Sequence, residues 1–333
     1  MKKLFFSLVA TMLATVSFAQ STLVATLSHE GNISMYYGTN ALINAHTAAM
    51  HGDVITLSSG SFLPVNITKA VTIRGASMGV ADAIQVEPTI LSGNFYVDIS
   101  DTTTAQLTIE GIYHNHSISI GHLKDAKFHK CRLWYINYKD SALIQNLMII
   151  NCRVVSNLYC PSNSSVVCIN SAIGYPDSDN TTHFEFTNCI IHKPNIGSNV
   201  YNSYFKNCIL VGNSSSSNYL NSTCVAYNCL NVDTSSSSIF RNVLNSTNYH
   251  DNYKNVFTSY AGGYFVDGEN FELTDMAKET YLGMDGTQVG VLGGSLPFTA
   301  YLANPQITRC TVASKSTADG KLSVDIEVNG NKQ

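Results

Sequence analysis

The sequence has few charged residues and no basic excess. Only 13% of its 333 residues are Asp, Glu, Lys or Arg, and the formal net charge is −4. Proteins that bind nucleic acids need a basic surface for the phosphate backbone, so we expect no such partner. Few stretches have the Ala, Glu, Lys and Leu content that favours helices. A polar surface built from Ser, Thr and Asn is typical of an extracellular β-rich protein.

Long hydrophobic runs are also lacking. A transmembrane helix needs about twenty consecutive apolar residues, and the run Leu4–Val16 is shorter. This run follows Lys2 and Lys3 and precedes the small residues Ser17 and Ala19, which is the order of a signal peptide cleaved after Ala19. Cleavage would change the net charge from −4 to −6. We expect export to the periplasm, the cell surface or the medium, and no membrane span.

Common catalytic motifs are missing. The chain has no Gly-x-Ser-x-Gly elbow, no P-loop and no Gly-x-Gly-x-x-Gly. His29-Glu30 lacks the second His of a zinc-peptidase motif. Whether the protein is an enzyme therefore stays open.

An internal repeat is present between residues 105 and 232. Each unit is an alternating apolar strand, a polar residue that is usually Asn, and then usually Cys. The Asn-like position is occupied by Gly111, Lys130, Asn151, Asn170, Asn188, Asn207 and Asn228. The next position holds Cys131, Cys152, Ser171, Cys189, Cys208 and Cys229. Steps of 18 to 21 residues match one coil of a parallel β-helix.

Stacked coils explain these residue types. Strand side chains alternate sides, so Ile149, Phe186 and Phe205, two positions before the Asn, should point inward. The Cys should point inward again beyond a bend. Coils lie about 4.8 Å apart, which places equivalent residues in columns. Asn tolerates a left-handed backbone at a bend, and we expect its side chain to hydrogen-bond the amide of the stacked neighbour.

The repeat resembles the pectate-lyase-like superfamily of right-handed parallel β-helix proteins, whose Asn ladder lies in a tight turn between strands. The signal segment, ending Phe18-Ala19-Gln20, resembles those of Bacteroides-type bacteria. The resemblance covers most of the mature chain and implies an all-β, single-stranded solenoid with a polysaccharide partner. Enzymes of this superfamily use a Ca²⁺ site with an Arg base, close Asp residues with Gly-His-Gly, or two Asp with an Arg. None of these sets stands here in the right order.

Both ends of the repeat predict caps. Helix-compatible spacing runs from Thr39 to Met50 and precedes a turn at Gly52-Asp53. Gln306–Val328 alternates around a Gly-containing turn and predicts a β-hairpin that caps the last coil or forms an appendage. We divide the chain into signal peptide, N-terminal cap, β-helix and C-terminal hairpin cap at residues 1–19, 20–52, 53–300 and 301–333.

The nine cysteines are odd in number, and five lie on the ladder. Stacked neighbours are close enough for disulfides, but their Cβ vectors run parallel, which is poor geometry for that bond. We predict buried free thiols that act as small apolar residues. No Cys-x-x-Cys pair exists, so zinc is not expected.

Arg132 and Arg153 each follow a ladder Cys and should stack, facing outward, one coil apart. One interpretation is a clamp for a uronate or sulfate. The other is a solvated pair whose repulsion is screened.

Aromatic side chains follow these arginines. Trp134, Tyr135, Tyr138 and Tyr159 form either a stacking platform for sugar rings or a cover over the core. His129, one of four clustered histidines, is either a binding or acid–base residue or a plain polar one.

Asp177 and Asp179 alternate on a turn that could hold Ca²⁺, although an ordinary acidic turn is favoured and no cofactor is expected. We expect a monomeric, secreted or surface protein that binds polysaccharide. The alternatives are a polysaccharide lyase or glycoside hydrolase acting on an acidic or pectin-like glycan, and an adhesin or structural surface protein. Two outward carboxylates about 5–10 Å apart would favour an enzyme, whereas Ser, Asn and Tyr alone would favour binding.

Overall fold

A computed structural model describes most of the chain from Leu23 to Asn329. The described residues are 23–79, 87–100, 104–177, 180–192, 200–212, 220–232, 239–242, 248–260, 265, 267–299, 306–312, 320–321 and 324–329. Only the backbone is described for residues 140, 241–242, 306–312 and 324–329. The expected signal peptide lies outside these ranges. Two compact units, Met1–Ala300 and Tyr301–Gln333, are distinguished.

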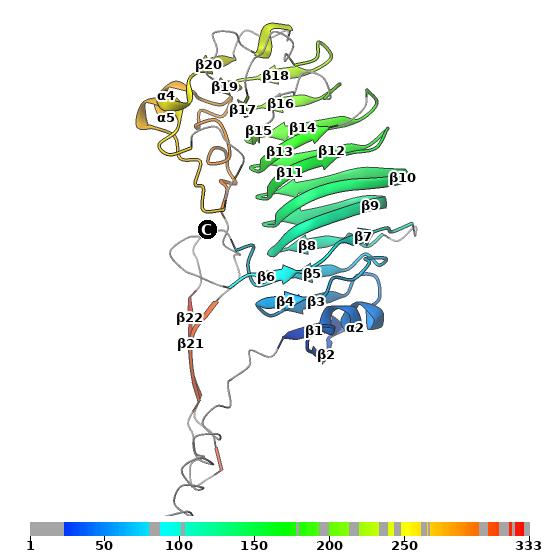
Figure 1. The fold of residues 1–333 in the computed structure, drawn as a ribbon. Coiled ribbons are helices and arrows are strands. Elements are labelled where there is room, and N and C mark those ends of the chain that lie inside the picture. The colour runs from blue at the N-terminus through cyan, green and yellow to red at the C-terminus, as the bar shows by residue number, and fades with distance from the viewer. Residues whose placement is uncertain are drawn as a thin grey trace, which may run out of the picture. The chain divides into compact units, whose positions relative to one another are not determined.

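The first unit is the predicted all-β parallel β-helix, a solenoid of about eight turns (Figure 1). Its strands are β1 (Val24–His29), β2 (Asn32–Tyr37), β3 (Val54–Leu57), β4 (Gly60–Phe62), β5 (Thr72–Arg74), β6 (Thr89–Leu91), β7 (Phe95–Val97), β8 (Thr108–Glu110), β9 (Ile112–His129), β10 (Arg132–Ile150), β11 (Arg153–Tyr159), β12 (Ser165–Ile169), β13 (Ala172–Asp177), β14 (His183–Thr187), β15 (Ile190–His192), β16 (Tyr204–Lys206), β17 (Ile209–Val211), β18 (Val225–Tyr227), β19 (Leu230–Val232) and β20 (Tyr249–Asp251).

The strands stack in parallel on three sides of the coil. The first stack, before the Asn turn, contains β3, β5, β8, the ends of β9 and β10, then β12, β14, β16 and β18. The second stack, after that turn, contains β4, β6, the starts of β9 and β10, then β11, β13, β15, β17, β19 and β20. The third stack contains β7, the middle parts of β9 and β10, and the ends of β11 and β13.

The interior is filled by columns of like residues. Ile149, Cys168, Phe186 and Phe205 lie in one column by strand register, and all are fully buried. The rings of Phe186 and Phe205 stack with centroids 5.1 Å apart. Burial of such aromatic side chains, repeated from coil to coil, is the main source of stability in a stacked fold.

The Asn turn forms the predicted column. Its residues have φ between 45° and 67° in the left-handed region, from Gly111 to Asn228. Their backbone N–H groups, not their side chains, bond the next coil: Asn151 N donates to Ile169 O at 3.0 Å and Asn170 N to Thr187 O at 3.0 Å. The expected bonds from Asn side chains to stacked amides are thus replaced by backbone bonds, which leaves the side chains free to point away from the coil.

The cysteine column lies directly inside this turn. Cys131 N donates to Cys152 Sγ at 3.3 Å, and Cys208 N to Cys229 Sγ at 3.4 Å. Ser171 takes the same place in its coil and accepts from Cys152 N at 3.0 Å. The eight cysteines with described side chains are free and buried, as predicted. Three of them, Cys152, Cys208 and Cys229, accept from backbone amides of the preceding coil.

At the N-terminal end, α2 (Ala41–Ala48) lies against the antiparallel β1–β2 hairpin and β3 (Figure 1). Its apolar face, with Leu42 and Ala45, joins the main core. Lys69 Nζ donates to the carbonyls of His46, Thr47 and Ala49 at 2.7–2.9 Å, which satisfies the end of the helix.

Beyond β20 the chain turns back along the second stack. We call residues 253–299 the cover segment; it contains α4 (Tyr253–Val256) and α5 (Asp275–Thr280). A second apolar core joins it to the outward residues Ala172, Ile190, Ile209 and Leu230, one from each successive strand. Its own contribution includes Phe257, Tyr260, Phe265, Phe271, Val289 and Val291. The second stack therefore has a core on both faces.

The second unit contains β21 (Gln306–Val312) and β22 (Val324–Asn329), paired antiparallel. The described part of the first unit also contains a short 3₁₀ helix, η1 (Ile239–Asn242). Within the described part of the chain, no helix is both long and apolar enough to cross a bilayer.

Candidate binding face on the third stack

The Asn side chains hold the cover segment in place. Asn170 Nδ2 donates to the carbonyls of Val291 and Gly293 at 2.9 and 2.7 Å. Asn151 Oδ1 accepts from Thr299 N at 2.9 Å, and Asn228 Nδ2 donates to Leu282 O at 3.0 Å. The side chains of the ladder thus bond backbone groups of the cover segment that lie outside its helices α4 and α5.

Arg132 and Arg153 lie beneath this cover. They are paired by strand register, as expected, but are only 6% and 0% exposed. Arg132 Nε is 3.1 Å from Asp267 Oδ1, and its guanidinium lies 4.6 Å from the Tyr113 ring centroid. Arg153 Nη2 donates to Glu269 O at 2.6 Å. Neither a solvated pair nor an open anion clamp describes them, because the cover segment already supplies their partners.

His129 belongs to a different surface. It lies on the first stack, where its Nδ1 is 3.7 Å from Glu110 Oε1. The other Glu110 oxygen is 3.5 Å from Arg74 Nε. Pairing with His129, stronger than the opposing effect of burial, lowers the pKa of Glu110. These stacked charges form an ion-pair row on the coil surface.

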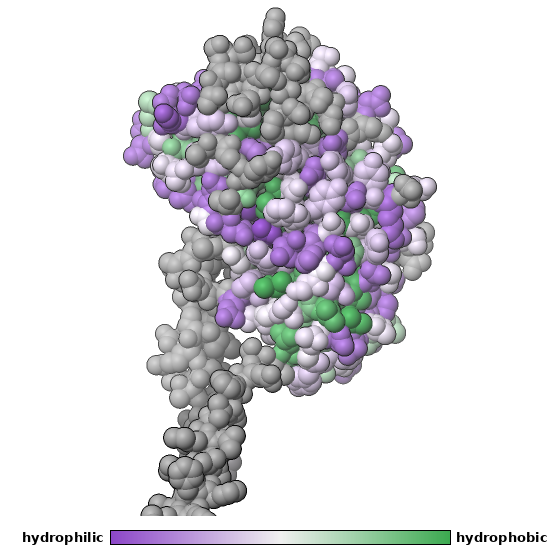
Figure 2. Space-filling model, viewed as in Figure 1, coloured by the Kyte–Doolittle hydropathy of each residue, from purple (hydrophilic) through white to green (hydrophobic). Residues whose placement is uncertain are grey.

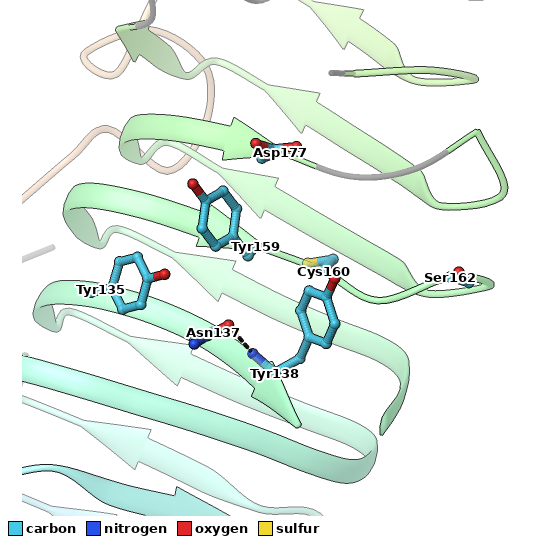
Figure 3. A pocket seen from close by; sticks show the side chains of 7 residues that line it. All are labelled: Tyr135, Asn137, Tyr138, Tyr159, Cys160, Ser162 and Asp177. Carbon is cyan, nitrogen blue, oxygen red and sulfur yellow. Dashed lines mark hydrogen bonds between the residues drawn. The ribbon is translucent and has the colours of Figure 1, made fainter. Parts of the chain in front are cut away.

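Three of the four aromatic residues singled out in the sequence meet in one pocket on the third stack. Tyr135, Tyr138 and Tyr159 line it, together with Asn137, Cys160, Ser162 and Asp177, and its volume is about 400 Å³ (Figure 3). Trp134 is not among the residues that line it: its ring lies 5.7 Å from the Arg132 guanidinium.

Strand register explains why these residues meet. The inward residues Ile136, Leu158 and Pro176 occupy one column on β10, β11 and β13. Side chains flanking that column point outward on each coil, and Tyr159 pairs directly with Asp177. Register shifts before Ile136 and before Leu158 determine the positions of the outward-pointing tyrosine rings.

The tyrosines form a corner. The rings of Tyr135 and Tyr159 have centroids 5.6 Å apart and planes at 81°, so the edge of one meets the face of the other. Tyr138, which is 42% exposed, lies on the middle part of β10, and its N–H donates to Asn137 Oδ1 at 2.7 Å (Figure 3). Perpendicular rings offer both an aromatic face and a hydroxyl to a ligand.

Burial and neighbouring groups shift the pKa values of several side chains in the pocket. Partial burial, then Tyr159 and Asp177, raise the pKa of Tyr135. Burial, followed by Asp177, raises the pKa of Tyr159. Burial also raises the pKa of the Cys160 thiol far above its ordinary value, so the pocket wall there is neutral. Tyr135 and Tyr159 therefore keep their hydroxyl protons at neutral pH and can both donate and accept hydrogen bonds.

Polar residues extend the face along the solenoid toward the N-terminus. Tyr96, Ser119 and Asn137 lie in register on consecutive coils. Lys139 Nζ lies 4.0 Å from the Tyr96 ring centroid. Over much of the side of the coils seen in Figure 2, residues are hydrophilic or near neutral, with smaller apolar groups between them.

The described residues contain no group of three His, Cys, Asp or Glu side chains placed to hold a metal ion. Asp177 lies at the end of β13, but Asp179, its expected partner in a Ca²⁺ turn, lies outside the described residues. The idea of a calcium site therefore stays a weak hypothesis.

No protein-family model, no curated protein and no solved structure matches this chain. Its function has to be argued from the geometry above.

Sequence reasoning missed several members of the site. Asn137, Ser162 and Cys160 carry no distinctive motif, and their approach to the tyrosines depends on the register shifts between coils. The sequence does contain a pattern that indicates the cover segment. The position after each ladder Cys changes from Arg132 and Arg153 to Ile190, Ile209 and Leu230, and a row of outward aliphatic residues indicates a second layer.

Proposed function

We propose that this protein binds polysaccharide through the outer face of the third stack, with the pocket of Tyr135, Tyr138 and Tyr159 as its centre. The observation that carries the proposal is the meeting of three partly exposed tyrosines with Asn137 and Asp177 in one open pocket. Aromatic faces stack on the apolar faces of sugar rings, while amide, hydroxyl and carboxylate groups bond sugar hydroxyls. The remaining open residues of the face, Ser119 and Tyr96, provide further contacts along the axis.

Binding is favoured over cleavage. A glycosidase needs two carboxyl groups about 5–10 Å apart, and among the described residues that line the pocket Asp177 alone carries one. A lyase needs a cation beside the substrate carboxylate and a base for the α proton. The arginines that could have served as the cation are covered by the cover segment. The expected export to the cell surface or periplasm is consistent with a glycan ligand and remains part of the proposal.

The test is a glycan array probed with the mature protein, followed by calorimetry on the oligosaccharides it retains. Tyr159→Ala should weaken binding by about two- to tenfold, because an aromatic contact contributes about 0.5–1.5 kcal/mol. Tyr227→Ala is the matched control. Tyr227 and Tyr204 form a similar half-buried ring pair, 5.6 Å apart, on the first stack.

Equal loss in both variants, or retention of affinity by Tyr159→Ala, would contradict the proposed face. Formation of unsaturated products absorbing in the ultraviolet from an acidic polysaccharide would instead establish the lyase alternative.

A further inference from the structure

The N-terminal end of the solenoid presents a strand with an open edge. β1 pairs with β3, and among the described strands β2 pairs with β1 alone, so β2 is the outermost strand of the first stack (Figure 1). Open edges of natural sheets usually carry charged residues, proline or a bulge that prevents further pairing. β2 reads Asn-Ile-Ser-Met-Tyr-Tyr, without charge or proline, and its pairing with β1 has no register shift. Its edge can therefore accept another strand.

Three exposed apolar side chains share the outer face of β2. Ile33, Met35 and Tyr37 are 71%, 54% and 58% exposed. They alternate along the strand and therefore point to the same side, where the Tyr37 hydroxyl donates to Met35 Sδ at 3.6 Å. Rows of exposed apolar side chains mark surfaces that another molecule covers.

The same three residues direct their backbone groups toward the open edge. Gly38 N donates to Leu23 O at 2.9 Å, which continues the register of the β1–β2 pair. Backbone groups alternate sides along a strand, so the even-numbered residues of β2 bond β1. The odd-numbered residues Ile33, Met35 and Tyr37 then point their N–H and C=O groups away from β1.

A second copy of β2 fits this edge in a self-complementary register. Both strands have to bring their odd-numbered residues together, and antiparallel pairing about a two-fold axis at Met35 gives the largest overlap. Met35 then faces Met35 of the second copy, and Ile33 faces Tyr37 of the second copy. Each of these pairs can exchange two backbone hydrogen bonds. Aromatic and β-branched side chains are also favourable partners across strands.

The fold holds β2 ready for this pairing. Glu30 and Gly31 form a two-residue turn with φ of 47° and 84°, the positive values of a tight hairpin turn that matches the strand twist. On the inner face, Tyr36 packs against the main core. An edge strand fixed in this way loses little conformational entropy when it pairs.

We propose that the protein forms a two-fold symmetric dimer, in which β2 pairs antiparallel with β2 of a second copy. The pairing uses the open edge of both chains, so the assembly closes at two copies. A single strand pair buries less than about 1,200 Å², which is typical of weak complexes, and we expect micromolar affinity. The dimer departs from the monomer expected from the sequence and does not depend on the proposed glycan-binding function.

Sedimentation velocity over a micromolar concentration series measures the equilibrium. The wild-type chain should change from monomer to dimer as its concentration rises. Met35→Lys places two ammonium groups opposite each other at the axis and should weaken dimerisation about tenfold or more. Met276→Lys is the matched control, because Met276 is 57% exposed on α5, and it should leave the equilibrium unchanged. All three chains should have the same circular dichroism.

Cysteine cross-linking tests the register. In a Cys310→Ser background, Met35→Cys should form a covalent dimer when oxidised by O2 with copper–phenanthroline, because the two introduced thiols meet at the axis. Ser28→Cys is the control. Ser28 is exposed and pairs with Ile33, but it lies on β1, one strand away from the edge, and should not cross-link.

Three outcomes would overturn the proposal. The first is a wild-type chain that stays monomeric at its highest soluble concentration. The second is equal weakening of the dimer by Met35→Lys and Met276→Lys, because the contact then does not involve β2. The third is a dimer that Ser28→Cys cross-links as readily as Met35→Cys does.

Discussion

Asn170 of the ladder performs two separate tasks. Its backbone adopts the left-handed turn, with φ 45° at Asn170, while its side chain, which is almost completely buried, donates to two carbonyls of the cover segment. The same turn position is Gly111 in an earlier coil. The backbone task alone can thus be met by glycine, whereas the side-chain task needs the amide.

Two substitutions at Asn170 separate these tasks. Asn170→Ala should destabilise the protein by about 2–4 kcal/mol, through two lost hydrogen bonds and a strained left-handed alanine. Asn170→Gly loses the same bonds without that strain and should cost about 1 kcal/mol less. Urea denaturation followed by circular dichroism measures both. Equal losses would mean that the turn conformation is not strained in alanine.

The cysteine column contributes hydrogen bonds to the fold as well as packing. Cys208 Sγ lies 3.5 Å from Cys189 N and 3.2 Å from Lys206 O, and Ser171 makes the equivalent contacts with oxygen. Cys208→Ser should therefore change stability by less than about 1 kcal/mol. Cys208→Ala, which leaves a buried amide unpaired, should cost about 1–3 kcal/mol.

Thiol labelling is the complementary measurement. In a Cys310→Ser background, native protein at pH 8 should not react with a thiol reagent, because burial raises the pKa of thiols such as Cys160 and Cys168. All eight should react in guanidinium. Rapid labelling of the native chain would show that the column opens readily.

Among the elements, α2 contains a pH-sensitive residue. His46 is 3% exposed, its Nε2 has no hydrogen-bond partner, and burial, aided by the charge of Lys69, lowers its pKa to about 4. The unfolded chain binds a proton at this residue near pH 6.5, and the folded chain does so only near pH 4. Stability should therefore fall as the pH drops from 6.5 to 4, by up to about 3 kcal/mol.

Urea midpoints at pH 7.5 and pH 4.5 test this effect. His46→Leu keeps an apolar side chain at the site and should show a smaller drop than the wild type over the same interval. Identical drops in both proteins would assign the acid sensitivity to other groups.

The sequence allows some elements to be predicted more completely than others. The repeat period and the residue types were sufficient to predict the coils, because Asn151, Asn188 and Asn207 share one backbone conformation and stack by register. The burial of Arg153 could not be predicted from the repeat period and the residue types. Its burial depends on Glu269 and Phe271, more than a hundred residues later, in a segment without repeat or regular strand. Likewise the tyrosines could be grouped from their spacing, but only the register shifts bring Tyr135 beside Tyr159 and place Trp134 beside Arg132 instead.

For the whole molecule, the cover segment should be required for a stable solenoid and the second unit should not. A chain that ends after Asn252 exposes Ile190, Ile209 and Leu230 in a continuous apolar row. We expect it to aggregate or to bind a hydrophobic dye strongly. A chain that ends after Ala300 keeps the first unit complete and should retain the wild-type circular dichroism and unfold within about 3 °C of it.

Thermal unfolding scans and dye-binding measurements on both truncated chains test whether the cover segment and the second unit are required. A well-folded, dye-negative product ending at Asn252 would show that the inner core alone is sufficient.

The contacts between the Asn ladder and the cover segment also determine the order in which the fold can be completed during biosynthesis. A chain emerging from the ribosome can wind its first coils early, yet Asn151 does not meet Leu296 and Thr299 until 145 and 148 more residues have followed. Until then the aliphatic row on the second stack has no partner. The nascent protein is thus most vulnerable to sticking and proteolysis late in translation, when its coils are already built but still uncovered.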